Sequence, residues 1–173
     1  MVVRKGIYRV NLTKLFKTQA ELDKRIVEEK GLQGQDLLEP KILAMQTEIG
    51  ELANEIPREF KFWSNKENNY EKALIEFVDI LHFALSIGNL LEIKPSEVKR
   101  QRIKKMGIVK TLIDMQIGAG VLMYRHQSPE SNYLKFFNQL LHLGSMLGFT
   151  RNEIEQAYYQ KNEINHERQA NGY

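Results

Sequence analysis

The chain has 173 residues, a formal net charge of +3 and no cysteine. Without cysteine there are no disulfides or zinc–thiolate centres, and so mild a charge does not demand a nucleic-acid partner. A hydrophobic fraction of 42% and a charged fraction of 27% are typical of a soluble globular domain with a buried core. Apolar runs are broken before they reach membrane-span length, and no signal-peptide pattern opens the chain. We therefore expect a soluble cytoplasmic protein with no membrane or nucleic-acid partner.

The first ten residues show no hydrophobic period and are interpreted as an arm. A helix is predicted from Leu12, because Asn11 or Thr13 can cap it and an apolar stripe follows at helical spacing. Gln19 falls inside that stripe and is expected to point inward, where a buried amide either ties down backbone or binds a ligand. Asp23 follows one turn later on the same side and is placed to share either role.

A second helix is predicted after the polar connection that begins at Gly31. Pro40 suits its first turn, and the helix is expected to end near Pro57. It carries Glu48 and Glu51, which are three residues apart and so lie on one face. Because they border an apolar stripe, a solvated helix edge is the alternative to a pair of ligands.

A third helix, ending near residue 91, carries Glu76 and Asp79. It is apolar on every side, which predicts burial, and a buried carboxylate is costly without a partner. The alternative is an ion pair, but the nearest bases, Lys66 and Lys72, lie at or before the start of this helix. Four carboxylates on two adjacent antiparallel helices would repel one another. The pattern therefore predicts a divalent metal site, with Mg²⁺ favoured where phosphates supply further ligands.

The loop between these helices, residues 58–69, mixes aromatic and basic side chains. It holds Trp63, the only tryptophan of the chain, with Phe60, Phe62 and Lys66 close by in sequence. Aromatic rings in a basic loop beside a metal site suit a ligand with a flat ring and phosphates. The alternative is that these rings pack onto the domain as the hinge of a lid.

Three further helical segments are predicted at about 96–104, 108–125 and 131–147, with Ser96 as the cap of the first. The segment 108–125 is apolar over a wide face. That face is wider than one domain of this size needs, so we interpret it as a subunit contact.

A last helix is predicted after Thr150, which opens a capping box with the sequence T-x-x-E. Along this helix Lys161, Asn165 and Arg168 continue a stripe that begins with apolar residues. Polar side chains that take over an inward stripe are placed to reach a ligand, and a solvated tail is the alternative. The segment from about 158 to 173 is also a candidate mobile lid, because chain ends fray unless they are tied down.

The motif Glu48-x-x-Glu51, followed by Glu76-x-x-Asp79, resembles the signature of the all-α nucleoside-triphosphate pyrophosphohydrolase superfamily. Within it, the segments ELANE, FKFWSNK, EFVDILHFALSIG and KNEINHERQANGY are similar to those of the dimeric dUTP pyrophosphatases of phages and Gram-positive bacteria. The resemblance implies an all-α helical bundle with a four-helix core around the metal site. It also implies one domain over residues 1–173 and a homodimer.

The resemblance further implies hydrolysis of dUTP to dUMP and pyrophosphate, with dUDP as a further candidate substrate. Glu48, Glu51, Glu76 and Asp79 would bind Mg²⁺, and Glu48 would also orient or deprotonate the attacking water. His82, which shares a face with Asp79, is expected to support the site from the core.

The implied substrate contacts come from four parts of the chain. The amide of Gln19 would read the uracil edge, since it can donate and accept in one plane. The remaining contacts are Trp63 and Phe83 to the base, Lys66, Lys161 and Arg168 to phosphates, and Asn165 to the 3′-hydroxyl.

Two other function classes stay open from the sequence. One is a related pyrophosphatase of different base specificity, acting on dCTP or on noncanonical nucleotides, which the context of Gln19 and Trp63 disfavours. The other is a protein that also captures a regulatory repressor, as some phage members of the family do. The intact set of metal ligands indicates that activity is retained in either case.

Overall fold

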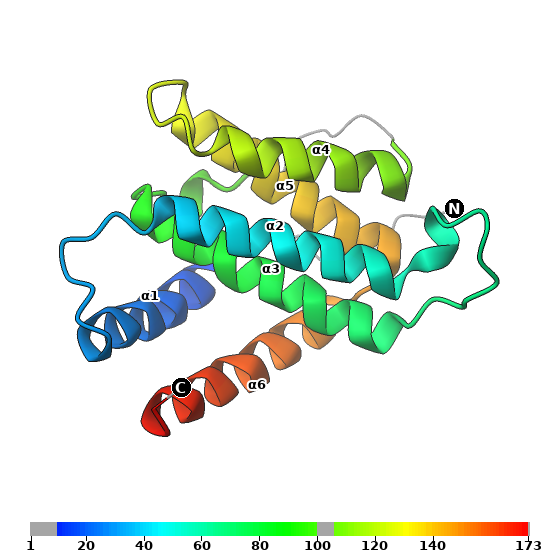
Figure 1. Cartoon of the computed structure of the whole chain (residues 1–173). Helices are drawn as coiled ribbons and strands as arrows, with labels where there is room; N and C mark the ends of the chain where they lie inside the picture. The colour runs from blue at the N-terminus through cyan, green and yellow to red at the C-terminus, as the bar shows by residue number, and fades with distance from the viewer. Residues whose placement is uncertain (1–9, 100–105, 173) are drawn as a thin grey trace.

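The structure, a computed structural model, describes residues 10–99 and 106–172, and these residues form helices with no strand among them (Figure 1). This confirms the predicted all-α class. The arm expected over the first ten residues lies almost wholly outside the described residues. The α-helices are α1 Leu12–Glu29, α2 Leu38–Glu55, α3 Tyr70–Leu90, α4 Ile108–Val121, α5 Pro129–Leu147 and α6 Arg151–Ala170, with 3₁₀ turns η2 Pro57–Glu59 and η3 Pro95–Glu97.

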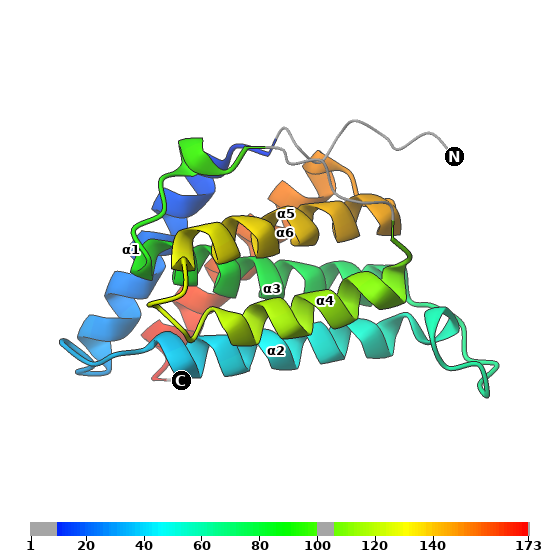
Figure 2. The same ribbon diagram turned by 90° about the horizontal axis from the view of Figure 1, so that it is seen from above.

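The antiparallel pair α2 and α3 lies at the centre of the bundle (Figure 1). The α4–α5 hairpin covers one side of this pair, and α1 and α6 lie on the other side (Figure 1). Seen from the side of the hairpin, α6 passes behind α3 and α5 (Figure 2). α1 and α6 run in the same direction, because the start of α1 contacts the start of α6 and a later part of α1 contacts a later part of α6. The Asn11 backbone N–H donates to Glu155 at 2.8 Å, and Arg25 contacts His166 Nδ1 at 3.2 Å.

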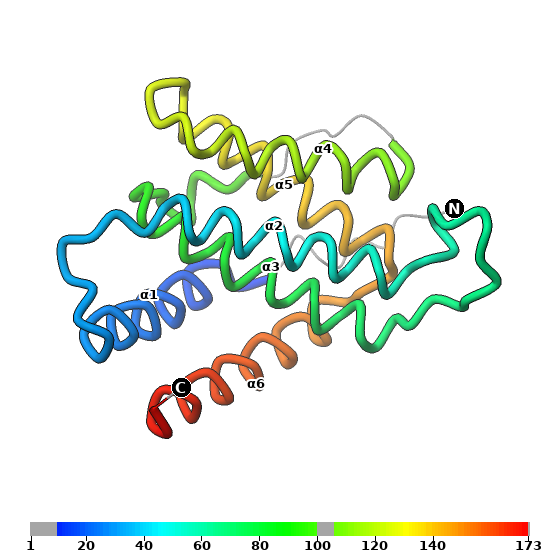
Figure 3. Tube along the Cα trace, in the orientation of Figure 1, coloured from blue at the N-terminus to red at the C-terminus, as the bar shows by residue number. Residues whose placement is uncertain are grey.

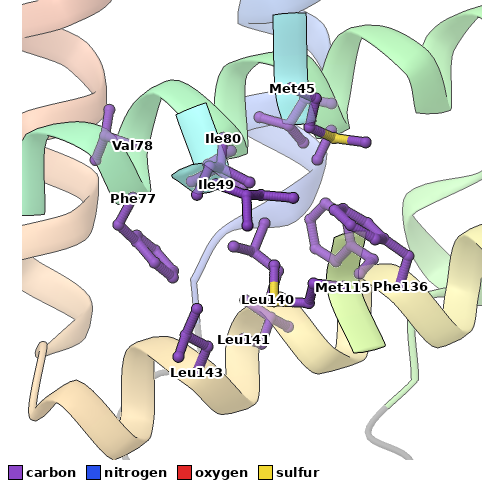
Figure 4. Close-up of a cluster of buried hydrophobic side chains, with 14 of the residues drawn as sticks. Met45, Ile49, Phe77, Val78, Ile80, Met115, Phe136, Leu140, Leu141 and Leu143 are labelled. Carbon is purple, nitrogen blue, oxygen red and sulfur yellow. The ribbon is translucent and has the colours of Figure 1, made fainter. Parts of the chain in front are cut away.

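An apolar core fills the space between α2, α3, α4 and α5 (Figure 4). Its members include Met45 and Ile49 of α2, Phe77 and Ile80 of α3, Met115 of α4, and Phe136 and Leu140 of α5. By length and composition α3 could cross a membrane, but 67% of its most apolar stretch is buried inside the bundle. It is the central helix of this core, as the sequence predicted for a helix that is apolar on every side.

The predicted caps of the first and last helices are confirmed. The Asn11 side chain accepts from the backbone N–H of Lys14 at 3.1 Å, which starts α1. Thr150 and Glu153 form the reciprocal capping box of α6. These caps position α1 and α6 on the same side of α2 and α3.

The prediction of a helix at 96–104 is wrong over residues 96–99, which the structure describes. The chain forms only the turn η3 there, and Ser96 lies inside this turn rather than capping a helix. The Lys94 backbone N–H donates to the Glu97 carboxylate at 2.8 Å, which closes the turn, and Val98 already leaves helical geometry. Residues 100–105 lie outside the described residues.

Candidate active site

α1, α2, α3 and α6 enclose a cavity of about 410 Å³. Its lining combines acids, bases and apolar residues with the polar side chains Gln19, His82, Ser86, Asn165 and Gln169. The acids are Asp23, Glu48 and Asp79, the bases are Lys41, Lys161 and Arg168, and the apolar residues are Leu22, Ile26, Val27, Leu37 and Phe83. A cavity with both apolar walls and convergent charges suits a ligand that has an apolar ring and an anionic part.

Three carboxylates meet where α2 and α3 cross this cavity. One oxygen of each of Glu48, Glu76 and Asp79 lies within 4.8 Å of the others. The i, i+3 spacing on α3 turns two of these acids toward α2, as predicted. Glu51, one turn further along α2, is exposed and lies outside this cluster of three.

The carboxylates raise one another's proton affinity. Burial, followed by the charges of Asp79, Glu51 and Glu76, raises the pKa of Glu48 to about 7. Burial and the charge of Asp79 also raise the pKa of Glu76 above its ordinary value. The cluster is therefore short of positive charge in the ligand-free chain.

Positive charge reaches the cluster from α6. Lys161 Nζ lies 2.5 Å from Asp79 Oδ2. Burial still raises the pKa of Asp79, because desolvation outweighs the hydrogen bond and charge of Lys161. The ion pair considered from the sequence thus exists for Asp79, but its base lies 82 positions away rather than at the start of α3.

The cluster fits a divalent metal ion. All of its ligand atoms are carboxylate oxygens, which hard cations such as Mg²⁺ and Ca²⁺ prefer. The raised pKa of Glu48 indicates that more positive charge would be favourable than Lys161 supplies. A bound divalent cation would relieve the repulsion between these acids.

About one helical turn from Asp79 and Lys161, Gln19 is buried and hydrogen-bonded to side chains of three helices. Its Nε2 donates to Asp23 at 3.0 Å, while its Oε1 lies 2.7 Å from His82 Nδ1 and 3.0 Å from the Tyr158 hydroxyl. The His82 ring also stacks on Tyr158, with 4.2 Å between ring centroids. His82 is therefore a buried residue that supports Gln19, in keeping with its expected place in the core.

The structure brings most of the predicted site residues together. Glu76 meets the cavity through the carboxylate cluster. The predicted residues that line the cavity itself are Gln19, Glu48, Asp79, Phe83, Lys161, Asn165 and Arg168. Residues from four helices therefore converge on one cavity.

Trp63 and Lys66 do not line the cavity. The loop that carries them projects beyond the ends of α2 and α3 (Figure 3). Trp63 is 68% exposed and Phe62 is 94% exposed, and their rings meet edge to face at 4.8 Å. Neither ring is packed away as in the hinge interpretation, and the substrate contacts of Trp63 and Lys66 stay predictions.

Three polar residues of the cavity were not predicted from the sequence, namely Lys41, Ser86 and Gln169. Ser86 follows Asp79 by seven residues on α3, so helical spacing alone could have placed it on the same face. Lys41 lies 3.7 Å from Asp23, which belongs to another helix. Nothing in the local pattern around Lys41 points to this contact.

The sequence model of one protein family, described as dUTPase, matches residues 11–173. The match spans all six α-helices and every predicted site residue. No curated protein matches the chain.

Proposed function

The chain belongs to the dUTPase family and is a dUTP diphosphatase, and on this premise we propose that its carboxylate cluster binds Mg²⁺ for the reaction. The observation that carries this proposal is the meeting of Glu48, Glu76 and Asp79 within 4.8 Å at one end of the cavity. Glu51, one turn further along α2, would join them once cations are present. Bound there, Mg²⁺ would neutralise phosphate charge and lower the pKa of a coordinated water.

Glu48 is the proposed acceptor of the proton from the attacking water. It is half-buried and lines the cavity beside Asp79, so a water held at the cluster would lie next to its carboxylate. The water oxygen bonds to phosphorus, its proton passes to a Glu48 oxygen, and the bridge between the α- and β-phosphates breaks. The products are dUMP and pyrophosphate.

The remaining cavity residues are proposed to hold the substrate along the axis between Gln19 and the carboxylates. Phe83 and the neighbouring apolar wall would contact the base, and Asn165 the 3′-hydroxyl. Lys161 and Arg168 would bind phosphate oxygens by charge-assisted hydrogen bonds. Lys161 already lies at the carboxylates, so a phosphate bound there could share it with Asp79.

The enzyme is proposed to act as a homodimer. Ile113 and Ile117 are 54% and 61% exposed on α4, and Leu43 is 67% exposed on the neighbouring α2. α2 and α4 are joined by reciprocal hydrogen bonds between Gln46 and Gln116, of 3.1 and 3.0 Å. These helices thus present one apolar surface of the kind that subunit contacts cover.

Light scattering on the double variant Ile113→Glu/Ile117→Glu tests the homodimer. We expect the mass of a dimer for the unmodified protein and of a monomer for the variant, because buried unpaired carboxylates are costly. Leu90→Glu, at the end of α3, is the control and should stay dimeric. A variant that keeps the dimer mass would place the subunit contact elsewhere.

Hydrolysis of a panel of deoxynucleoside triphosphates, with products separated, tests the proposed chemistry. We expect dUTP to be the best substrate, with dUMP and pyrophosphate as products. Activity should be lost in EDTA and restored by Mg²⁺. Faster hydrolysis of dCTP would favour the related enzyme of different base specificity, and full activity in EDTA would contradict the metal proposal.

A further inference from the structure

The amide of Gln19 is held in one orientation by three side chains. A carboxylate accepts hydrogen bonds and does not donate them, so Asp23, 3.0 Å away, fixes the amide nitrogen on its own side. The amide oxygen therefore faces His82 and Tyr158, at 2.7 and 3.0 Å. Both of these residues must donate to it.

The donors are fixed in turn. Burial lowers the pKa of His82 to about 3, so its ring is neutral and carries one N–H, which the contact with Gln19 assigns to Nδ1. The Tyr158 hydroxyl has two acceptors in reach, and the one on Gln19, at 3.0 Å, is nearer than the Leu15 carbonyl at 3.3 Å. Stacking holds the His82 and Tyr158 rings face to face.

Asp23 is also held in place. Its Oδ2 accepts from the Ser86 hydroxyl at 2.7 Å and lies 3.7 Å from Lys41 Nζ. The oxygen that faces Gln19 is therefore not free to rotate away. Asp23, rather than the ligand, decides which way the amide points.

This network leaves Gln19 with a single unused polar group. Its oxygen already has two donors, which is the full capacity of a carbonyl oxygen. Among the described residues Asp23 is the one acceptor of its nitrogen, so the second N–H remains for a ligand in the cavity that Gln19 lines. From the sequence, the amide was expected both to donate and to accept toward the base, whereas in this orientation it can only donate.

We propose that Asp23 is a positioning residue that fixes Gln19 as a donor toward the base, and thereby selects a C4 carbonyl over a C4 amino group. Uracil carries the carbonyl and cytosine carries the amino group. A donor that faces another donor leaves two buried groups unpaired, and mismatches of this kind give strong discrimination. The inference rests on the proposed function and adds the origin of its base specificity.

Asp23→Asn is the sharpest test. The introduced amide has nearly the same shape, but it can donate as well as accept, so the Gln19 amide can turn over and present its oxygen to the base. The Ser86 hydroxyl can still donate to the introduced oxygen in that arrangement. Loss of the Lys41 ion pair would affect dUTP and dCTP alike, because both carry the same triphosphate, and so it cancels in the ratio of their kcat/KM values.

Tyr158→Phe is the second variant, because it removes one donor to the Gln19 oxygen. Its matched control is Tyr133→Phe. Tyr133 is equally buried, and its hydroxyl donates to the Ala84 carbonyl at 2.8 Å, outside the cavity. Both Phe variants lose one buried hydroxyl, so a shared loss of stability is expected, while base preference should change only for Tyr158→Phe.

The readout is the kcat/KM for dUTP divided by that for dCTP, measured with Mg²⁺ on variants whose helical circular dichroism is retained. We expect the ratio to fall by about tenfold or more in Asp23→Asn, through a gain on dCTP, and severalfold in Tyr158→Phe. An unchanged ratio in both folded variants, or an equal fall in Tyr133→Phe, overturns the inference. If Asp23→Asn does not fold, Tyr158→Phe decides. Should the unmodified protein fail to prefer dUTP, the proposed function fails instead.

Discussion

Two parts of the cavity treat their polar groups in opposite ways, the base end around Gln19 and the metal end at the carboxylate cluster. At the base end, the amide of Gln19 has partners for its oxygen and for one N–H before any ligand binds. At the metal end, Glu48, Glu76 and Asp79 crowd together, and Lys161 gives a close ion pair to Asp79 alone. The base end is hydrogen-bonded in the ligand-free chain except for one N–H of Gln19 and the buried Nε2 of His82, while the metal end is electrostatically unfavourable.

This difference separates two tasks of the site. Base recognition needs a fixed pattern of donors, which a satisfied network supplies without cost on binding. Metal binding needs concentrated negative charge, which lowers the stability of the metal-free protein and is offset only when cations arrive. The contrast therefore predicts opposite effects on stability for mutations at the two ends.

The largest effect is expected from Glu76→Gln. This change keeps the shape of the side chain but removes one charged ligand, so kcat/KM for dUTP should fall by about a hundredfold or more. Steady-state kinetics across a Mg²⁺ titration measures it. Glu71→Gln, an exposed site five residues earlier on α3, is the control and should stay close to the unmodified enzyme. Near-normal turnover of Glu76→Gln at saturating Mg²⁺ would remove Glu76 from the ligand set.

Gln19→Ala breaks the base end and is expected to destabilise the protein. It removes the acceptor of the buried His82 Nδ1 and the donor to Asp23 Oδ1, while the Tyr158 hydroxyl keeps the Leu15 carbonyl. We expect a cost of about 1–3 kcal/mol. Urea unfolding measures this loss, and the preference for dUTP over dCTP should shrink at the same time.

The control for Gln19→Ala is Asn138→Ala, which removes a buried amide that donates to the Leu134 carbonyl at 2.8 Å on α5. It should also lower stability, but it should leave base preference unchanged. If Gln19→Ala proves as stable as the unmodified protein, the network around Gln19 is not the stabilising element that its geometry indicates.

Helical spacing predicted the parts of this site that depend on one helix. The pairs on α2 and α3, the inward position of Gln19 and the polar stripe of α6 all follow from which residues share a helix face. The wrong helix near 96–104 has a local cause, since the Glu97 carboxylate closes a turn there with the Lys94 backbone. Patterns of residue type cannot tell such a turn from the first turn of a helix.

Contacts between helices distant in the chain were beyond sequence reasoning. The partner of Asp79 is Lys161, and the partners of Gln19 include Tyr158. Both partners lie on α6, far along the chain from α1 and α3. Spacing shows that each of these residues points inward, but not which one it meets. The loop of Trp63 was predicted to reach the site because its aromatic and basic residues suit a nucleotide. Its position depends instead on how the ends of α2 and α3 are joined, which residue types do not show.

The smallest expected effect is a gain in stability from Glu48→Gln, at the metal end. The ordinary pKa of this carboxyl is 4.5, and burial with the neighbouring acids raises it to about 7 in the folded chain. Below pH 4.5 both states carry the proton, so Glu48 has no effect on stability. As the pH rises from 4.5 to 7 the unfolded chain loses its proton first, so folding becomes less favourable. Above pH 7 this loss is complete.

Because Gln carries no charge, Glu48→Gln should escape this loss. For a half-buried group, and after allowance for solvent screening, the gain at pH 8 is about 1 kcal/mol, and it should vanish near pH 4.5. Urea unfolding in EDTA at the two pH values measures it. Glu21→Gln, an exposed change on α1, should have the same small effect at both pH values. Saturating Mg²⁺ should reverse the order, because it stabilises only the chain with its full ligand set. A variant no more stable than the unmodified protein at pH 8 would show that the acids do not repel one another, and the two ends would then not differ in kind.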